Sequence, residues 1–253
     1  MSVHLHVRSC YTLLKSTLTI PKIVACAKQY GYSAVALTDH NVMHGAMAFY
    51  HACKKENIKP IYGIEVDVVE KEDLFGFVVL AKNDEGYQNL LKLSTLVNTG
   101  ESLKQITMDT LSFYAKNCVV LTNGDQNYME TLLLKEESDL LRHWLKKCNE
   151  IFDDFYVSIA RNDSGLLERK NPLLKSICKE LGIKTVALSR IYFEKEEDEE
   201  SYKMLCAIDQ GVTVQDKMLN YSPRRFFRSP SQMQELYDQD DLDATDEIAS
   251  MCN

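Results

Sequence analysis

The sequence predicts an α/β protein built on a mainly parallel sheet or barrel. Six or seven short apolar segments have the length and composition of strands, and amphipathic helical segments lie between most of them. No linker or low-complexity stretch divides the 253 residues. Alternation of this kind is typical of parallel β-α units, whose chemistry lies at the carboxyl ends of the strands. It does not determine the strand order, so a closed barrel and an open sheet both remain alternatives.

The first half of the chain opens with a short extended segment at 2–7. A helix follows that begins near Pro21, where proline suits the first turn, and ends at Gly31, which is a typical C-cap. The next expected segments are a strand at 33–40, a helix at 44–57, strands at 59–70 and 76–83, and a helix at 84–98.

The second half repeats the rhythm. The expected segments are strand 117–123, helix 127–148, strand 154–161, helix 165–182, strand 183–189 and helix 198–211. After a loop around Pro223 we expect two short helices, at 230–238 and 242–251.

Composition excludes several classes of protein. No apolar run reaches membrane-spanning length and no signal-peptide layout opens the chain, so we expect a cytoplasmic protein without a membrane partner. The net charge of −8 argues against a stand-alone nucleic-acid binder, and the acidic runs at 194–200 and 238–247 are typical of solvated surface. Eight scattered cysteines without a CxxC pair indicate reduced thiols. P-loop, G-x-G-x-x-G and G-x-S-x-G motifs are absent from the sequence.

Candidate ligands stand at the ends of three expected strands. They are His4 and His6 in "VHLHVRS", Asp39 and His40 in "SAVALTDH", and Glu65 and Asp67 in "YGIEVDV". Imidazoles and carboxylates together suit zinc, manganese or iron, and paired sites of this kind activate water for phosphoester hydrolysis. The positions of His6, His40 and Glu65 on successive units favour convergence of these three side chains.

Structural roles are the alternative for each of these residues. A histidine on a buried strand is commonly a hydrogen-bonded core residue, and an aspartate before a loop, such as Asp39, is typical of a cap or turn. For His44, His51 and His143, which lie on or beside expected helices, we favour structural roles.

Longer stretches resemble a known family. "HLHVRSCYTLLKSTLTI" (4–20), "AVALTDHNVMHGAMAFYHACKKENIKPIYGIEVDV" (34–68) and "VVLAKNDEGYQNLLKLST" (78–95) are similar to the polymerase and histidinol phosphatase (PHP) domain. The form resembled is the N-terminal PHP domain of bacterial replicative DNA polymerase III α subunits, DnaE type. "YSPRRFFRSPSQMQELY" (221–237) and "DEIASMCN" (246–253) resemble the stretch before the polymerase region of those subunits.

The resemblance implies a distorted (β/α)7 TIM-like barrel in residues 1–215. Residues 216–253 would then be a C-terminal extension leading towards a polymerase region. The parent protein would be a DNA-directed DNA polymerase, a nucleotidyltransferase of DNA replication, and this fragment alone would be inactive.

The resemblance also assigns ligand places. His6, His40 and Glu65 stand where PHP phosphoesterases place metal ligands. Other residues replace the family's ligands at several further places. These are Arg8, Lys15 and Arg190, which are cations, Tyr192, Gly76 in place of a histidine, Gly124 in place of a cysteine, and "ARND" (160–163) in place of a histidine-bearing turn.

The three cations suggest how a metal centre could have been replaced. A buried carboxylate that loses its metal ion is costly unless another positive group pairs with it. A guanidinium supplies that charge together with hydrogen bonds. We therefore hypothesise that Arg8 or Arg190 pairs with Glu65 or Asp39 in an ion network that replaces the metal cluster.

Three functions follow as alternatives. The first is a catalytically silent scaffold with a vestigial metal site and no cofactor, whose partners are the rest of the polymerase chain, a proofreading exonuclease subunit and DNA. The second is a metal-dependent 3′-5′ exonuclease or phosphoesterase acting in proofreading, with one zinc or manganese ion at His6, His40 and Glu65. The third is a free-standing small-molecule phosphatase of the histidinol-phosphate type.

A basic and aromatic cluster in "YSPRRFFRS" (221–229) allows two interpretations. Its side chains could contact nucleic-acid phosphates and bases, or the aromatic residues could dock on the barrel while the arginines pair with acidic runs. The residues concerned are Arg224, Arg225, Phe226, Phe227 and Arg228.

Overall fold

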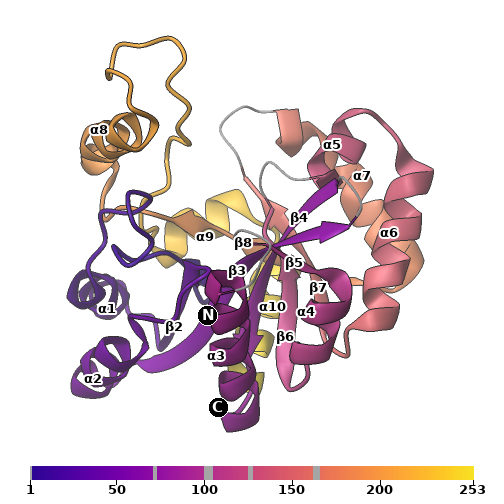
Figure 1. Ribbon diagram of the computed structural model, residues 1–253, viewed down its shortest axis with the longest axis horizontal. Helices are drawn as coiled ribbons and strands as arrows, with labels where there is room; N and C mark the ends of the chain where they lie inside the picture. The colour runs from indigo at the N-terminus through magenta and orange to yellow at the C-terminus, as the bar shows by residue number, and fades with distance from the viewer. Residues whose placement is uncertain (1, 71–72, 100–104, 125–127, 162–165) are drawn as a thin grey trace.

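The computed structural model describes residues 2–70, 73–99, 105–124, 128–161 and 166–253 (Figure 1). The strands are β1 (His6–Val7), β2 (Ala34–His40), β3 (Lys59–Glu70), β4 (Asp73–Ala81), β5 (Gln105–Thr107), β6 (Cys118–Thr122), β7 (Phe155–Ala160), β8 (Lys184–Leu188) and β9 (Arg190–Ile191). The α-helices are α1 (Ile20–Gln29), α2 (Ala46–Glu56), α3 (Asp84–Thr99), α4 (Met108–Tyr114), α5 (Tyr128–Leu134), α6 (Ser138–Ile151), α7 (Leu166–Leu181), α8 (Glu199–Gln210), α9 (Pro230–Leu236) and α10 (Gln239–Met251), and a short 3-10 helix, η1, spans Glu196–Asp198.

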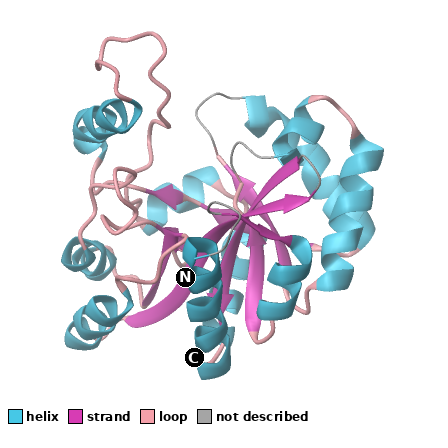
Figure 2. Cartoon of the chain, viewed as in Figure 1, coloured by secondary structure: helices cyan, strands magenta, loops and turns pink. Residues whose placement is uncertain are grey.

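The strands curl into a distorted barrel surrounded by helices (Figure 2). The larger sheet has the order β2-β3-β4-β6-β7-β8, with β5 beside β3, and β1 pairs in parallel with β9. A bridge between His4 and Val35 brings the β1 segment beside β2. Because β9 directly continues the β8 segment, one stretch of chain pairs with β7 on one side and with β1 on the other. This arrangement confirms the distorted (β/α)7 TIM-like barrel.

Strand β4 departs from the expected parallel arrangement. It runs antiparallel to both β3 and β6. A parallel pair needs a crossover of a dozen or so residues, whereas β3 ends at Glu70 and β4 begins at Asp73. The sequence carries this signal, since no helical segment separates the strand expected at 59–70 from the one expected at 76–83.

Two further regions differ from the expectation. The single helix expected at 127–148 is two helices, α5 and α6, and Glu136 between them has a φ of 62°, a left-handed conformation that interrupts an α-helix. Strand β5 and helix α4 were not predicted, because a strand of three residues and a helix of seven are too short to show a clear hydrophobic period.

The C-terminal helices pack on the barrel wall. Helix α10 lies along β8, and its Ala244 and Ile248 belong to the same buried apolar cluster as Leu121 of β6 and Val186 of β8. Helix α10, within 216–253, therefore contributes to the core. None of the helices in the described ranges is long and apolar enough to cross a membrane.

Candidate functional site

Glu65 is the centre of a buried polar cluster at the carboxyl end of the barrel strands. Strand β3 places it in register with His40 of β2, and its side chain is 1% exposed. The Nε atom of Arg8 donates to Oε2 of Glu65 at 2.7 Å, and a terminal nitrogen of Arg8 forms an ion pair with the same oxygen. Nη2 of Arg190 donates to Oε1 at 3.1 Å. Each oxygen of this carboxylate is thus bound by a different guanidinium.

Charge compensation dominates the electrostatics of Glu65. Burial by itself raises the pKa of a carboxyl group, but Arg8, His6 and Arg190 together outweigh burial and hold the pKa of Glu65 well below its ordinary value. The ring of Tyr192 lies beneath both cations, with its centroid 4.8 Å from the guanidinium carbon of Arg8 and 5.6 Å from that of Arg190. These contacts hold the two like charges beside one carboxylate.

His6 joins the cluster, whereas His4 does not. Nε2 of His6 lies 3.4 Å from Oε2 of Glu65, and its Nδ1 lies 2.8 Å from Oγ1 of Thr38. Nε2 of His4 donates to the carbonyl of Arg228 at 2.8 Å, and the ring of His4 packs against Phe227. The two histidines therefore serve different surroundings and do not share a ligand position.

The remaining candidate ligands have partners of their own. Nε2 of His40 lies 3.0 Å from Oδ2 of Asp67, and both side chains are 28% exposed. Asp39 accepts hydrogen bonds from the backbone N–H of Ser9 and from the hydroxyls of Ser9 and Thr12, each at 2.7 Å. Burial raises the pKa of Asp39 despite these hydrogen bonds. The two arginines therefore bind Glu65, whereas Asp39 binds hydroxyl groups and one backbone N–H.

Lys15 points away from the cluster. Its Nζ forms an ion pair with Asp209 of α8, and 49% of its side chain is exposed. This lysine therefore connects the loop after β1 with α8 and does not replace a metal charge beside Glu65.

Asn123 belongs to the cluster, although the sequence analysis did not single it out. Its Nδ2 donates to Oε1 of Glu65 at 3.2 Å. A Cβ atom built on Gly76 would lie only 1.8 Å from the same Nδ2 atom. The amide of Asn123 therefore fills the space that a side chain at position 76 would need. Its sequence position, directly after the buried strand β6, was the available signal.

The other replaced places are only partly described. Gly124 has a φ of 68°, and a Cβ there would lie 2.9 Å from the Cβ of Ala160, so a larger residue would be strained. Residues 162 and 163, the end of the "ARND" turn, lie outside the described residues.

The basic and aromatic segment at 224–228 is mainly internal. Arg225, Phe226, Phe227 and Arg228 are buried, and Arg224 is exposed. Nη1 of Arg228 donates to Oγ of Ser189 at 2.8 Å, and Phe226 pairs with Phe193 through an isolated bridge. This burial favours the docking interpretation, because a buried side chain cannot reach a nucleic acid.

The residues around Glu65 do not fit a metal ion. A divalent cation would have to displace two guanidinium groups from Glu65 and separate His40 from Asp67. In the part of the chain that the structure describes, no group of three or more His, Cys, Asp or Glu side chains is arranged to hold a metal ion.

We expect the free energy of unfolding to fall as the pH is lowered from about 6.5 to about 4. Burial lowers the pKa of His4 and of His6 from 6.5 to about 4. The unfolded chain therefore binds more protons in this window, and each histidine contributes a slope of about 1.4 kcal/mol per pH unit. The contribution of these two histidines to the free energy of unfolding is complete above pH 6.5 and is lost as the pH falls towards 4. Urea titrations at several pH values measure this slope.

Single His4→Gln and His6→Gln variants supply the control for this slope. Each variant should remove about one proton's share of the pH dependence. Equal slopes in the wild-type chain and in both variants would contradict the assignment.

Comparisons with known proteins identify a matching family model and similar chains. A family model described as "PHP domain" matches residues 4–162. DNA polymerase III subunit alpha of Bacillus subtilis is 32% identical over 99% of the chain, and that of Halalkalibacterium halodurans is 31% identical over 100%. The chain spans 23% of the length of each of these relatives.

A solved structure supports the fold independently of close sequence similarity. An amidohydrolase from Chromobacterium violaceum, with bound sulfate and no metal, aligns with a TM-score of 0.53 and 11% identity. The alignment covers 78% of this chain and 89% of that protein. At this identity, the likeness concerns the fold alone.

Proposed function

The chain belongs to the PHP domain family, and from this premise we propose that it is a catalytically silent scaffold domain of a bacterial DNA polymerase III α subunit. The relatives with this name, which the chain matches over 23% of their length, support the assignment to such a subunit. In this proposal residues 1–215 form the barrel domain and residues 216–253 lead towards the polymerase region. The rest of the polymerase chain is the first partner, and a proofreading exonuclease subunit and DNA are further partners.

One observation carries the proposal that the domain is silent. The carboxylate of Glu65 is bound on one oxygen by Arg8 and on the other by Arg190. A metal-dependent phosphoesterase needs such a carboxylate as a ligand and needs an open coordination position for water. Here the guanidinium groups supply the positive charge, but they offer neither a Lewis acid nor an activated water. The cluster stabilises the strand ends of the barrel instead.

The alternative is a metal-dependent 3′-5′ exonuclease with one zinc or manganese ion at His6, His40 and Glu65. The contacts of the described residues weigh against it, since His40 pairs with Asp67 and both arginines bind Glu65. A free-standing phosphatase of the histidinol-phosphate type would need the same ligands and is disfavoured for the same reason.

We expect the purified chain to bind less than one equivalent of zinc or manganese and to leave single-stranded DNA undigested. A tightly bound ion would raise the melting temperature, because a ligand of the folded state adds RT ln(1 + [L]/Kd) to its stability. Elemental analysis, thermal melts with and without metal, and DNA digestion assays provide three separate measurements.

The matched comparison is the double variant Arg8→His with Arg190→Asp, which restores ligand-type side chains at two of the replaced places. The scaffold proposal expects metal-dependent stabilisation to be stronger in this variant than in the wild-type chain. One equivalent of metal in the wild-type chain, together with DNA digestion that His6→Ala abolishes, would establish the exonuclease instead.

A further inference from the structure

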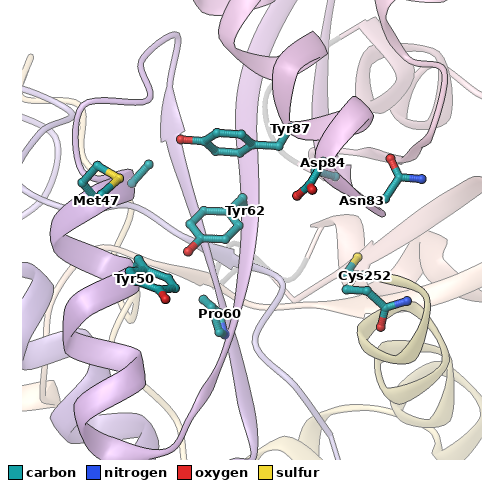
Figure 3. Close-up of a pocket in the computed structure, with 11 residues that line it drawn as sticks. Met47, Tyr50, Pro60, Tyr62, Asn83, Asp84, Tyr87 and Cys252 are labelled. Atoms are coloured by element: carbon teal, nitrogen blue, oxygen red, sulfur yellow. The ribbon is translucent and has the colours of Figure 1, made fainter.

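A hollow lies beside the first residues of β3 (Figure 3). It has a volume of about 340 Å³ and lies between α2, α3 and the first residues of β3, with Cys252 and Asn253 also in its lining. Tyr62, the lining residue of β3 nearest to Glu65 in sequence, precedes it by about 10 Å at the usual rise of a strand, and the described lining includes no residue of the Glu65 cluster. This hollow, which we call the tyrosine pocket, is therefore separate from the Glu65 cluster.

Three tyrosine rings form the wall of the tyrosine pocket. Tyr50 comes from α2, Tyr62 from β3 and Tyr87 from α3, and Figure 3 shows Tyr62 between the other two. The centroids of the Tyr62 and Tyr87 rings are 5.2 Å apart, and the planes meet at 67°. In this edge-to-face contact the two rings pack against each other. Aromatic faces beside an opening are typical of sites for organic cations, because such a face carries negative potential.

The charge around the tyrosine pocket has the complementary sign. Asp84, in the first turn of α3, is among its lining residues, whereas no lysine or arginine is among the lining residues that the structure describes. Outside the lining, Nζ of Lys54 lies 5.5 Å from the centroid of the Tyr50 ring and donates to its hydroxyl at 3.4 Å, so a cationic ligand would compete with this lysine for Tyr50. The net charge of −8 adds long-range attraction for positive ligands.

We propose that the tyrosine pocket binds an organic cation, an alkylammonium or guanidinium group, between its tyrosine rings and Asp84. The apolar walls, which include Met47 and Pro60, suit the carbon chain that such a group carries. Two sources share this chemistry: a free aliphatic polyamine, and a lysine or arginine side chain of a partner protein. A nucleotide phosphate would instead be repelled by Asp84, and no lysine or arginine is among the described lining residues to bind it.

The test is a titration of the 253-residue chain with spermidine and, separately, with a capped Gly-Arg-Gly peptide. Tyrosine ring signals in NMR spectra and calorimetry measure the binding. We expect saturable binding that Tyr50→Ala and Asp84→Asn each weaken about five- to tenfold. Binding of spermidine identifies a free cation as the source, and binding of the peptide alone identifies a protein side chain.

Tyr11→Ala is the matched control variant, because Tyr11 is 43% exposed and Tyr50 is 40% exposed. It should leave the affinity unchanged, and neutral octanediol should not bind. Absence of saturable binding for both cations would overturn the proposal. So would equal affinity in the Tyr50→Ala and Tyr11→Ala variants, or binding of octanediol as tight as that of spermidine.

Discussion

Replacement of Glu65 by glutamine is expected to lower the free energy of unfolding by about 3–5 kcal/mol, the usual cost of removing one partner from a buried ion pair. Glutamine keeps the size of the side chain and removes its negative charge. The guanidinium groups of Arg8 and Arg190, which bind this carboxylate, would remain buried without its charge. The amide nitrogen of glutamine is a donor, so it would face a guanidinium donor where a carboxylate oxygen now accepts a hydrogen bond. Urea unfolding followed by circular dichroism measures the change.

Glu150→Gln is the control for this loss. The carboxylate of Glu150 is 66% exposed and lies 4.0 Å from Nζ of Lys146, so its removal should change stability by less than about 0.5 kcal/mol. The triple variant Glu65→Leu, Arg8→Met, Arg190→Met should be more stable than Glu65→Gln, because it removes all three charges and leaves none of them buried and unpaired. A loss below about 1 kcal/mol in Glu65→Gln would show that the ion network does not organise this end of the barrel.

The cations of the site could be identified from the sequence, and their partner could be narrowed to Glu65 or Asp39, but the sequence could not decide between these two. Family resemblance placed Arg8 and Arg190 at ligand positions, and the need to compensate a buried carboxylate suggested an ion pair. Which carboxylate they bind depends on how far the strand ends lie from each other, and no spacing along the chain encodes that distance. Lys15 illustrates the limit: its charge suggested a role in the network, whereas the fold places it beside Asp209.

The fold was predictable to the extent that it follows local periodicity. Buried strands such as β2 and β6 and amphipathic helices such as α1 lie where their apolar patterns indicate. The closure of the barrel depends on the pairing of β1 with β9, two residues each. Pairing this short carries no period, so only the family resemblance could suggest a closed barrel.

Asn123 was missed because its role is reciprocal to that of a residue far away in sequence. An asparagine after a strand is an ordinary turn residue, and a glycine inside a strand is an ordinary irregularity. The two acquire meaning together, since β4 pairs with β6 and brings Gly76 against the amide of Asn123. A mutual fit of volumes across a sheet is a property of the folded chain.

The pair of Gly76 and Asn123 leads to the second large expected effect. We expect Gly76→Ala to lower the free energy of unfolding by about 1–3 kcal/mol, the usual cost of overpacking a core. The new Cβ would overlap the Nδ2 atom of Asn123, so this amide would have to move away and give up its hydrogen bond to buried Glu65. Urea unfolding of the single variants Gly76→Ala and Asn123→Ala and of the double variant measures the effect and the coupling between the sites.

The coupling distinguishes this mechanism from a general loss of stability. Once Asn123→Ala has removed the amide, an alanine at position 76 no longer meets it. The loss of unfolding free energy in the double variant should therefore be smaller than the sum of the two single losses by at least about 1 kcal/mol. Gly211→Ala is the matched control, because a Cβ there meets nothing within 4 Å and only its φ of 66° opposes the change. The cost of Gly211→Ala should be the same with and without Asn123. Additive effects at positions 76 and 123 would mean that the amide does not occupy the space of the missing side chain.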